Sequence, residues 1–363
     1  DAQVVQPYVS GLRSPVRTLP LPDGGLLVVE SGLGSVNTGR VSNVDRDGRR
    51  TTLIDGLPSG FHGAANDPTG PSAVLLQGNR LFILIGNGDI TLAGPGGTEI
   101  PNPAPSSPLF SSLLLLELPE GLGQLPTGFV LPRSAHEVIA GGGAVYLESA
   151  ERQVARLSRL YDFPDYSPAP RPDAPANVLI SNTFSMTGSA ARIDVADSAR
   201  NLVWSVSVAD RTATVLASFP PVANNTGMGA PMVDPVPTSV RAWRDDLLVG
   251  FLTGFPFGTG ASRVARIDRR TGEVSTLIPQ LTTVLDVLPV TRGRGAFYVL
   301  EYSTNFLAGA PGRLLLVEDP ARAPLPLVDT LQRPTSLSQD ARTGDLYVTE
   351  IGNGRVVRIV APR

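Results

Sequence analysis

The chain has 363 residues, 42% of them hydrophobic and 17% charged, with a formal net charge of -3 and no cysteine. So many apolar residues exclude a disordered chain, and the missing cysteines exclude disulfides, thiolate nucleophiles and cysteine-bound metal centres. The arginines are scattered and no apolar run approaches the roughly 20 residues that cross a bilayer, so we expect neither nucleic-acid binding nor membrane insertion.

A degenerate internal repeat begins near the N-terminus. The first unit has three segments, at residues 15–19, 22–30 and 39–45. Related units recur at residues 70–85, 184–206, 237–278, 284–317 and 334–359. Apolar and polar residues alternate within these segments, which is the pattern of strands with one buried face. The 38 glycines and 34 prolines indicate many tight turns between those strands.

The repeat predicts an all-β fold, a six-bladed β-propeller with four-stranded antiparallel blades. Units of roughly 45 to 55 residues cannot bury two apolar faces alone, so they must stack, and twisted sheets that stack radially close a ring. We expect one domain over residues 1–363. The lone strand at 4–9 should pair with the last unit, which has three strands of its own, and so close the ring.

Two segments break the period. Residues 92–108 are rich in Pro, Gly and Ser and indicate a loop that protrudes from the second blade. Residues 119–180 indicate an irregular insertion or an eccentric blade, with a strand at 144–147, a polar stretch up to Leu160 that could form a helix, and a Pro-rich tail. Long insertions in a rigid scaffold carry functional residues about as often as they have no function of their own.

Several segments resemble the ScyD/ScyE family over nearly the whole chain. The matching segments are Leu12-Arg-Ser-Pro15, Gly70-Pro-Ser with Ile85-Gly-Asn-Gly88, Val236-Pro-Thr-Ser-Val240, Leu252-Thr-Gly-Phe-Pro-Phe257 and Phe297-Tyr-Val-Leu-Glu301. The resemblance implies an exported six-bladed propeller with NHL-like repeats and supplies no catalytic motif. Asp1 followed by Ala-Gln is what cleavage of a signal peptide would leave, so we expect a secreted or periplasmic protein.

Carboxylates recur at the end of the second strand of a unit. They are Glu30, Glu301 and Glu350, with Asp197 as a possible equivalent. Because a residue needed once per blade is normally structural, we expect these side chains to accept hydrogen bonds from turn amides or to pair with the arginine of Gly-Arg-Val. Those arginines are Arg40, Arg313 and Arg355.

Other polar residues near the starts of inner strands do not repeat. Asp67, Asp286 and Asn66, together with Glu30, could offer hard oxygen ligands for Ca²⁺ near the axis, as in six-bladed lactonases of the SMP-30 type, to which the similarity is of fold alone. His62, one of two histidines, is predicted at the channel mouth, where a loop histidine without chemistry is the simpler interpretation. Gly86-Asn-Gly88 is interpreted as a turn between strands.

An aromatic cluster lies in a loop of the fourth unit. It consists of Phe251, Phe255, Pro256 and Phe257. These side chains could present an apolar contact surface or could plug the ring against a neighbouring blade.

These observations favour a secreted, non-catalytic module without a cofactor, which binds or scaffolds a protein or an extracellular assembly. The alternative is a divalent-metal-dependent hydrolase or lyase that acts on a small metabolite at the mouth of the channel. An enzyme needs unpaired carboxylates that converge on one cavity, whereas a scaffold needs paired carboxylates and an exposed apolar or Pro-rich patch.

Overall fold

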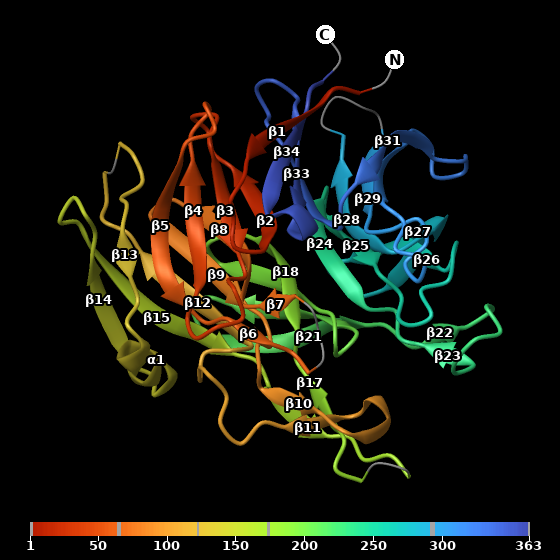
Figure 1. Ribbon diagram of the computed structural model, residues 1–363, viewed down its shortest axis with the longest axis horizontal. Coiled ribbons are helices and arrows are strands. Elements are labelled where there is room, and N and C mark those ends of the chain that lie inside the picture. Colours follow the sequence, from red (N-terminus) through yellow and green to blue (C-terminus); the bar gives the residue numbers. More distant parts are fainter. Residues whose placement is uncertain (1–2, 64–66, 122, 173–174, 291–294, 362–363) are drawn as a thin grey trace.

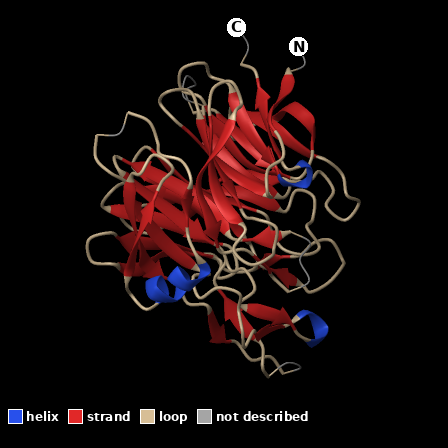
Figure 2. Cartoon of the chain, turned by 60° about the vertical axis from the view of Figure 1, so that its left-hand side comes forward, coloured by secondary structure: helices blue, strands red, loops and turns tan. Residues whose placement is uncertain are grey.

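The computed structural model describes residues 3–63, 67–121, 123–172, 175–290 and 295–361. They form a six-bladed β-propeller whose sheets stand around one axis (Figure 1). Strands make up nearly all of the regular structure and helices are few (Figure 2). The predicted fold class is therefore confirmed. Within the described ranges, no helix is long and apolar enough to cross a membrane.

The first two blades have five strands each. Blade 1 consists of β2 (Pro15–Pro20), β3 (Leu26–Glu30), β4 (Gly39–Val44), β5 (Arg50–Leu57) and β13 (Phe129–Val130), which pairs in parallel with β5. Blade 2 consists of β8 (Pro71–Gln77), β9 (Arg80–Ile85), β12 (Ser112–Glu117), β15 (Val154–Asp162) and β14 (Ala144–Glu148).

The remaining blades have four antiparallel strands each. Blade 3 contains β18 (Thr183–Gly188), β19 (Arg192–Asp197), β20 (Leu202–Ser207) and β21 (Thr212–Ser218). Blade 4 contains β24 (Pro237–Trp243), β25 (Asp246–Phe251), β26 (Ser262–Asp268) and β27 (Val274–Leu281). Blade 5 contains β28 (Val284–Pro289), β29 (Phe297–Glu301), β30 (Gly312–Val317) and β31 (Leu325–Leu331).

Blade 6 joins the two ends of the chain. It contains β32 (Pro334–Gln339), β33 (Leu346–Glu350), β34 (Arg355–Ile359) and β1 (Val5–Val9). β1 pairs antiparallel with β34, and the two strands lie side by side in Figure 1. This pairing confirms the predicted closure of the ring, which leaves blade 6 without the open edge that three strands would have.

Adjacent blades are joined by hydrogen bonds as well as by apolar packing. At five junctions a serine or threonine hydroxyl donates to a backbone carbonyl of the next blade, in the pairs Ser31 to Pro71, Ser72 to Thr183, Ser198 to Pro237, Thr238 to Val284 and Thr335 to Pro15. These residues are buried, so each bond also satisfies a hydroxyl that would otherwise be unpaired away from water.

Within the excursion at 119–180, the segment before β15 (Val154–Asp162) is an insertion within blade 2, and the segment after β15 connects blade 2 to blade 3. The insertion contributes β13 to blade 1, then helix α1 (Arg133–Ala140), then β14, before β15 completes blade 2. The helix therefore lies before residue 144, and the stretch up to Leu160 is the strand β15, which corrects the helix expected there. Ala155 and Leu157 are buried two positions apart, as in a strand, whereas α1 buries Ala135, His136 and Ile139 on one helical face.

Short hairpins and one-turn helices occupy the connections between the longer strands. The hairpins are β6 (Gly60–Phe61) with β7 (Pro68–Thr69), β10 (Thr91–Ala93) with β11 (Glu99–Pro101), β16 (Tyr166–Pro168) with β17 (Val178–Ile180), and β22 (Val222–Ala223) with β23 (Met232–Val233). The short helices are η1 (Pro95–Gly97) and η2 (Ile351–Asn353). The β10–β11 hairpin forms the predicted protrusion from blade 2 and lies well below the blades in Figure 1.

Candidate functional site

Every inner strand begins with a β-bulge. In each blade the first residue of the inner strand pairs with the end of the second strand, and the next residue is skipped in the register. The skipped residues are Val16, Ser72, Phe184, Thr238, Leu285 and Thr335. Because a bulge redirects one side chain out of the alternation, six equivalent bulges can direct six side chains toward one end of the channel.

Five of the six bulged residues line a cavity of about 360 Å³ at the channel mouth. They are Val16, Ser72, Phe184, Leu285 and Thr335. Connecting loops complete the wall and contribute Thr69, Asn87, Leu252, Tyr302 and Phe306 among others. The volume is at the lower end of those of small-molecule sites, and the lining is mainly apolar with a few polar groups, as in such sites.

Two polar side chains of this wall, those of Asn87 and Thr69, lack hydrogen-bond partners. The side chain of Asn87 has no exposed area, and neither its amide nitrogen nor its amide oxygen has a hydrogen-bond partner. The hydroxyl of Thr69, in the same wall, is also buried and unpaired. Buried polar groups are normally hydrogen-bonded, so an amide that lacks both bonds beside a cavity needs an explanation.

The backbone around Asn87 is held firmly. The N–H of Gly86 donates to the carbonyl of Gly70 at 2.7 Å, and the carbonyl of Gly86 accepts from Ser111 at 2.9 Å. Gly88 has a φ of +50°, and a Cβ at this position would overlap the ring of Phe110, so only glycine fits there. The turn that the sequence predicted thus presents Asn87 in a fixed position, a role that its sequence signal did not reveal.

The β6–β7 hairpin brings His62 and Asp67 to the mouth. Nε2 of His62 lies 2.9 Å from Glu99, whose carboxylate also accepts from the hydroxyl of Thr91 at 2.5 Å. Asp67 pairs with Arg333 from the connection between blades 5 and 6. Burial raises the pKa of Glu99, but the hydrogen bonds from His62 and Thr91 outweigh burial and leave that pKa below its ordinary value.

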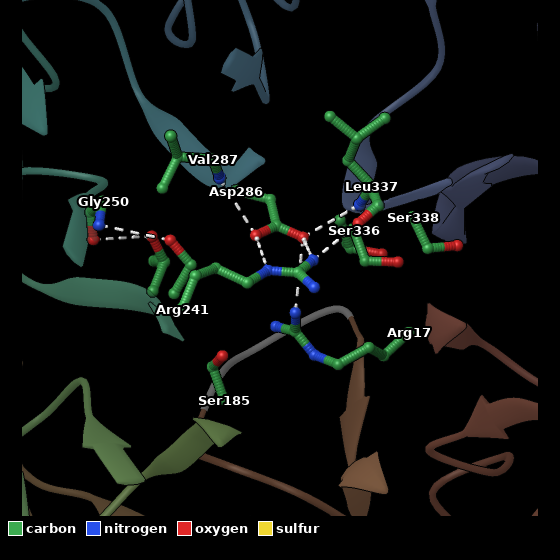
Figure 3. Close-up of polar contacts among 12 residues, drawn as sticks. Arg17, Ser185, Arg241, Gly250, Asp286, Val287, Ser336, Leu337 and Ser338 are labelled. Carbon is green, nitrogen blue, oxygen red and sulfur yellow. Dashed lines mark hydrogen bonds and ion pairs between the residues drawn. The ribbon is translucent and has the colours of Figure 1, made fainter. Parts of the chain in front are cut away.

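An arginine–aspartate–arginine group plugs the channel one residue deeper than the cavity. Arg17 and Asp286 directly follow the bulged residues Val16 and Leu285, and Arg241 reaches in from β24 (Figure 3). Asp286 has no exposed area and lies 3.4 Å from Arg17 and 2.5 Å from Arg241. We call these three residues the channel plug.

The plug touches all six inner strands. Arg17 donates to the backbone carbonyls of Ser72 in β8 and Phe184 in β18, at 3.3 and 3.4 Å. Asp286 in β28 accepts from the N–H of Leu337 in β32 at 2.9 Å, and Arg241 donates to the carbonyl of that leucine. Burial lowers the pKa of Arg17 to about 10, so the guanidinium stays charged at neutral pH.

Aromatic side chains from blades 4 and 5 form a stack at the edge of the mouth. Phe306 stacks on Phe257 with ring centroids 4.0 Å apart and on Tyr302 at 5.5 Å, and Tyr302 and Phe306 also line the cavity. Phe255 is 54% exposed and meets Phe257 edge to face. The sequence cluster missed Tyr302 and Phe306, because they lie about 50 residues away in the next blade.

Two residues of the predicted contact surface lie in the interior. Phe251 is 1% exposed, packs edge to face on Phe219, and has the guanidinium of Arg263 above its ring at 5.1 Å. Pro256 is buried as well. Phe251 is the last residue of β25, whose six residues are all buried, so its side chain cannot reach the surface.

The repeated glutamates pair as predicted. Glu30 binds Arg40 at 2.8 Å, Glu301 binds Arg313 at 2.5 Å and Glu350 binds Arg355 at 2.5 Å. Each carboxylate also accepts a backbone N–H from the residue two positions before its own inner strand, from Arg13, Thr282 and Gln332. We call each glutamate–arginine pair a blade clasp.

Two blades replace the clasp with other contacts. In blade 3, Asp197 accepts from the N–H of Asn182 at 2.9 Å and from the indole of Trp204 at 3.0 Å, and burial raises the pKa of this carboxyl. In blade 4 the equivalent contact is Arg263 over Phe251. Both cases show that the position serves the blade rather than a ligand.

The predicted calcium ligands have other partners. Asp67, Glu30 and Asp286 pair with arginines, and Asn66 lies outside the described residues. Both carboxylate oxygens of Asp286 are occupied by guanidinium and backbone donors. In the part of the chain that the structure describes, no three or more His, Cys, Asp or Glu side chains are grouped so that they could hold a metal ion.

The fold and the cavity define a class, a closed six-bladed β-propeller with a plugged channel and a hollow at one mouth. No family model and no curated protein matches the chain. Among solved structures, one described as a glucose dehydrogenase is 13% identical, with a TM-score of 0.53 over 99% of this chain and 100% of that chain. The extracellular domain of a protein described as a hybrid two component system from B. thetaiotaomicron is 10% identical, with a TM-score of 0.46 over 99% of this chain and 40% of that chain. At such identities the likeness shows the fold alone.

Proposed function

We propose that this chain is a non-catalytic binding module that holds a small molecule at the mouth of its channel. One observation carries the proposal: five of the six bulged side chains line a mainly apolar cavity of about 360 Å³ at the channel mouth, with a few polar groups in its wall. Small-molecule sites are hollows of this kind, which bury an apolar ligand body and orient it through a few polar groups.

The state of the carboxylates disfavours the hydrolase or lyase. Asp67 is the one carboxylate among the described residues of the cavity wall, and it pairs with Arg333. The nearest deeper carboxylate, Asp286, is enclosed by donors on both oxygens. General acid–base chemistry needs a side chain that is free to exchange a proton, and metal-assisted chemistry needs free ligands; in the described part of this wall, Asp67 pairs with Arg333 and His62 with Glu99.

A protein partner or extracellular assembly is the second candidate, favoured by an exposed apolar patch beside blade 4. Phe255 is 54% exposed, and Met228 and Met232 of the neighbouring hairpin are 51% and 50% exposed. Such a patch suits contact with another surface. Export and membership of the ScyD/ScyE family remain proposals that rest on the matching sequence segments.

The proposal is tested with naphthalene, a planar apolar probe small enough for the cavity. Binding to the folded state raises Tm by mass action, and the half-buried Leu252 offers a way to block the site without touching the core. Naphthalene should raise Tm of the wild type but not of Leu252→Trp. The matched control is Leu33→Trp, because Leu33 is exposed in a loop of blade 1 and does not line the cavity.

Two outcomes would contradict the proposal. An equal response of wild type and Leu252→Trp would place the probe elsewhere. A rise of several degrees with Ca²⁺ that EDTA reverses, together with hydrolysis of lactone or ester substrates, would favour the metal-dependent enzyme instead.

A further inference from the structure

We infer that the ligand of the channel mouth ends in a neutral vicinal diol, which hydrogen-bonds to the ion pair of Asp67 and Arg333. The inference rests on the proposed function and names the chemical class of the ligand's polar end.

A second hollow adjoins the cavity at the mouth. It has a volume of about 490 Å³ and is lined by a loop of blade 5 and by the connection to blade 6, with Pro311 and Gln332 in its wall. Asp67, Tyr302 and Phe306 line both this hollow and the cavity. A ligand whose body fills the cavity therefore has space to extend a polar end past these shared residues into the second hollow.

Asp67 and Arg333 lie at the boundary of the two hollows, and we call them the rim pair. Asp67 lines both hollows and Arg333 lines the second one. Their side chains are 36% and 42% exposed, so a ligand can reach both of them. Nε of Arg333 also donates to the hydroxyl of Tyr302 at 2.7 Å, which holds the guanidinium beside the aromatic stack.

The rim pair keeps hydrogen-bonding capacity on both of its members. A guanidinium carries several N–H donors and a carboxylate accepts through both oxygens, which is more than the contacts to each other and to Tyr302 use. The hydroxyl of Tyr302 donates to no acceptor among the described residues, and burial raises its pKa to about 12, so it keeps its proton at neutral pH. The rim therefore offers donors and an acceptor in one small area.

The charges of the rim pair favour a neutral group. They cancel each other, so an anionic ligand group would meet the carboxylate of Asp67 and a cationic one would meet the guanidinium of Arg333. A hydroxyl both donates and accepts, so two neighbouring hydroxyls can donate to Asp67 and accept from Arg333 without displacing either side chain. An apolar group would shield the pair from water and offer nothing in return.

The apolar wall determines the rest of the ligand. Phe184, Leu252 and Leu285 line the cavity, and Phe306 of the aromatic stack borders it. Rings and branched aliphatic side chains suit a flat apolar body, which buries its faces against them. A cavity of about 360 Å³ accommodates a bicyclic ring system. The ligand is thus an amphiphile with a flat apolar body and a diol at one end.

The test compares three naphthyl ethers of nearly the same size. They are 3-(1-naphthyloxy)propane-1,2-diol, which has the diol, 1-butoxynaphthalene, which has an apolar end, and 1-naphthyloxyacetate, which has an anionic end. Wild-type protein should bind the diol about tenfold more tightly than either of the other two in equilibrium dialysis, because hydrogen bonds to charged groups are among the stronger ones. Butoxynaphthalene also reports on the proposed function, because it needs only the cavity.

The double substitution Asp67→Leu with Arg333→Met removes the polar groups of the rim pair and keeps side chains of similar size. It should abolish the preference for the diol while butoxynaphthalene still binds, and that binding shows that the cavity is intact. The matched control is Asp319→Leu with Arg322→Met, because this exposed ion pair lines neither hollow. The control should leave the preference unchanged.

A vicinal diol occurs both in glycerol units and in sugar units. The same dialysis with 1-naphthyl β-D-galactoside distinguishes the two sources, because it presents the hydroxyls on a ring. Tighter binding of either diol than of butoxynaphthalene supports the inference, and the tighter of the two diols identifies the source.

The outcomes separate this inference from the proposed function. Binding of butoxynaphthalene without a preference for a diol would overturn the inference and leave the binding module standing. Tightest binding of the anionic ether, or a preference for the diol that persists in the rim-pair variant, would overturn it as well. Failure of every probe to bind would overturn both proposals.

Discussion

The blade clasps and the channel mouth treat buried polar groups in opposite ways. In each clasp the glutamate is buried, and its carboxylate accepts from an arginine and from a backbone N–H. Asn87 at the mouth is buried to the same degree, yet its amide accepts and donates nothing. Because an unsatisfied buried group costs about 1 to 3 kcal/mol, the clasps add to the stability of the fold and the mouth subtracts from it.

The channel plug lies between these two extremes. It is satisfied like a clasp, but it occurs once and joins residues up to 269 positions apart in the sequence. Each clasp joins two strands of one blade, so its loss should destabilise that blade; blades 3 and 4 have other contacts at the same position. Loss of the plug should destabilise the packing of all six inner strands, because the plug contacts each of them.

The largest effect is expected from Asp286→Asn. This substitution removes the only carboxylate of the plug and leaves the guanidiniums of Arg17 and Arg241 without a counter-charge in a buried site. The free energy of unfolding in urea should fall by about 3 to 5 kcal/mol. The control is Asp329→Asn, because Asp329 is exposed; this substitution should change the free energy of unfolding little. An equally small loss of stability for Asp286→Asn would show that the plug does not hold the blades together.

A smaller loss is expected from Glu301→Gln in the clasp of blade 5. The glutamine keeps the size of the side chain but loses the charge that Arg313 and the N–H of Thr282 bind. The free energy of unfolding should fall by about 1 to 3 kcal/mol, measured beside the exposed Glu318→Gln. A loss as large as that of Asp286→Asn would remove the distinction between clasp and plug.

A pH-dependent effect is expected at Glu99. Its folded pKa lies below the unfolded value, so Glu99 stabilises the folded state above the unfolded pKa of about 4.3, and this contribution is lost as pH falls through the folded pKa. Glu99→Gln should therefore lower stability at neutral pH and make the decline in acid shallower. Urea unfolding between about pH 3 and pH 7 checks this; an unchanged acid profile would show that the bonds from His62 and Thr91 do not persist in solution.

The smallest effect is expected from Arg263→Leu in blade 4. This arginine lies over the ring of Phe251 where blades 1, 5 and 6 have a clasp, and a cation–π contact contributes about 0.5 to 1 kcal/mol at an exposed site and more where it is desolvated. Thermal and urea unfolding should show a loss below that of Glu301→Gln. A larger loss would mean that the cation–π contact stabilises blade 4 more than the clasp stabilises blade 5.

Features that repeat could be predicted from the sequence. The alternating segments gave the six blades, and the recurrence of Glu30, Glu301 and Glu350 gave the clasps, because each clasp joins neighbouring strands of one blade. The closing strand followed from a unit that lacked its fourth strand. In each case the two partners are close in sequence or equivalent in the repeat.

Features that occur once could not be predicted. Asp286 was identified as unusual, but its partners Arg17 and Arg241 are brought to it by ring closure, which the sequence pattern does not align residue by residue. Asn87 was interpreted as part of a turn, and the local sequence pattern does not predict that its side chain is buried. The one available signal was a polar residue between two glycines directly after the buried strand β9.

The most direct test of the account is isothermal titration of naphthalene into the wild type, Leu252→Trp and Leu33→Trp. The account predicts that the wild type and Leu33→Trp bind the probe and that Leu252→Trp does not, because Leu252 lines the cavity and Leu33 does not. Binding by all three proteins, or by none of them, would contradict the central claim.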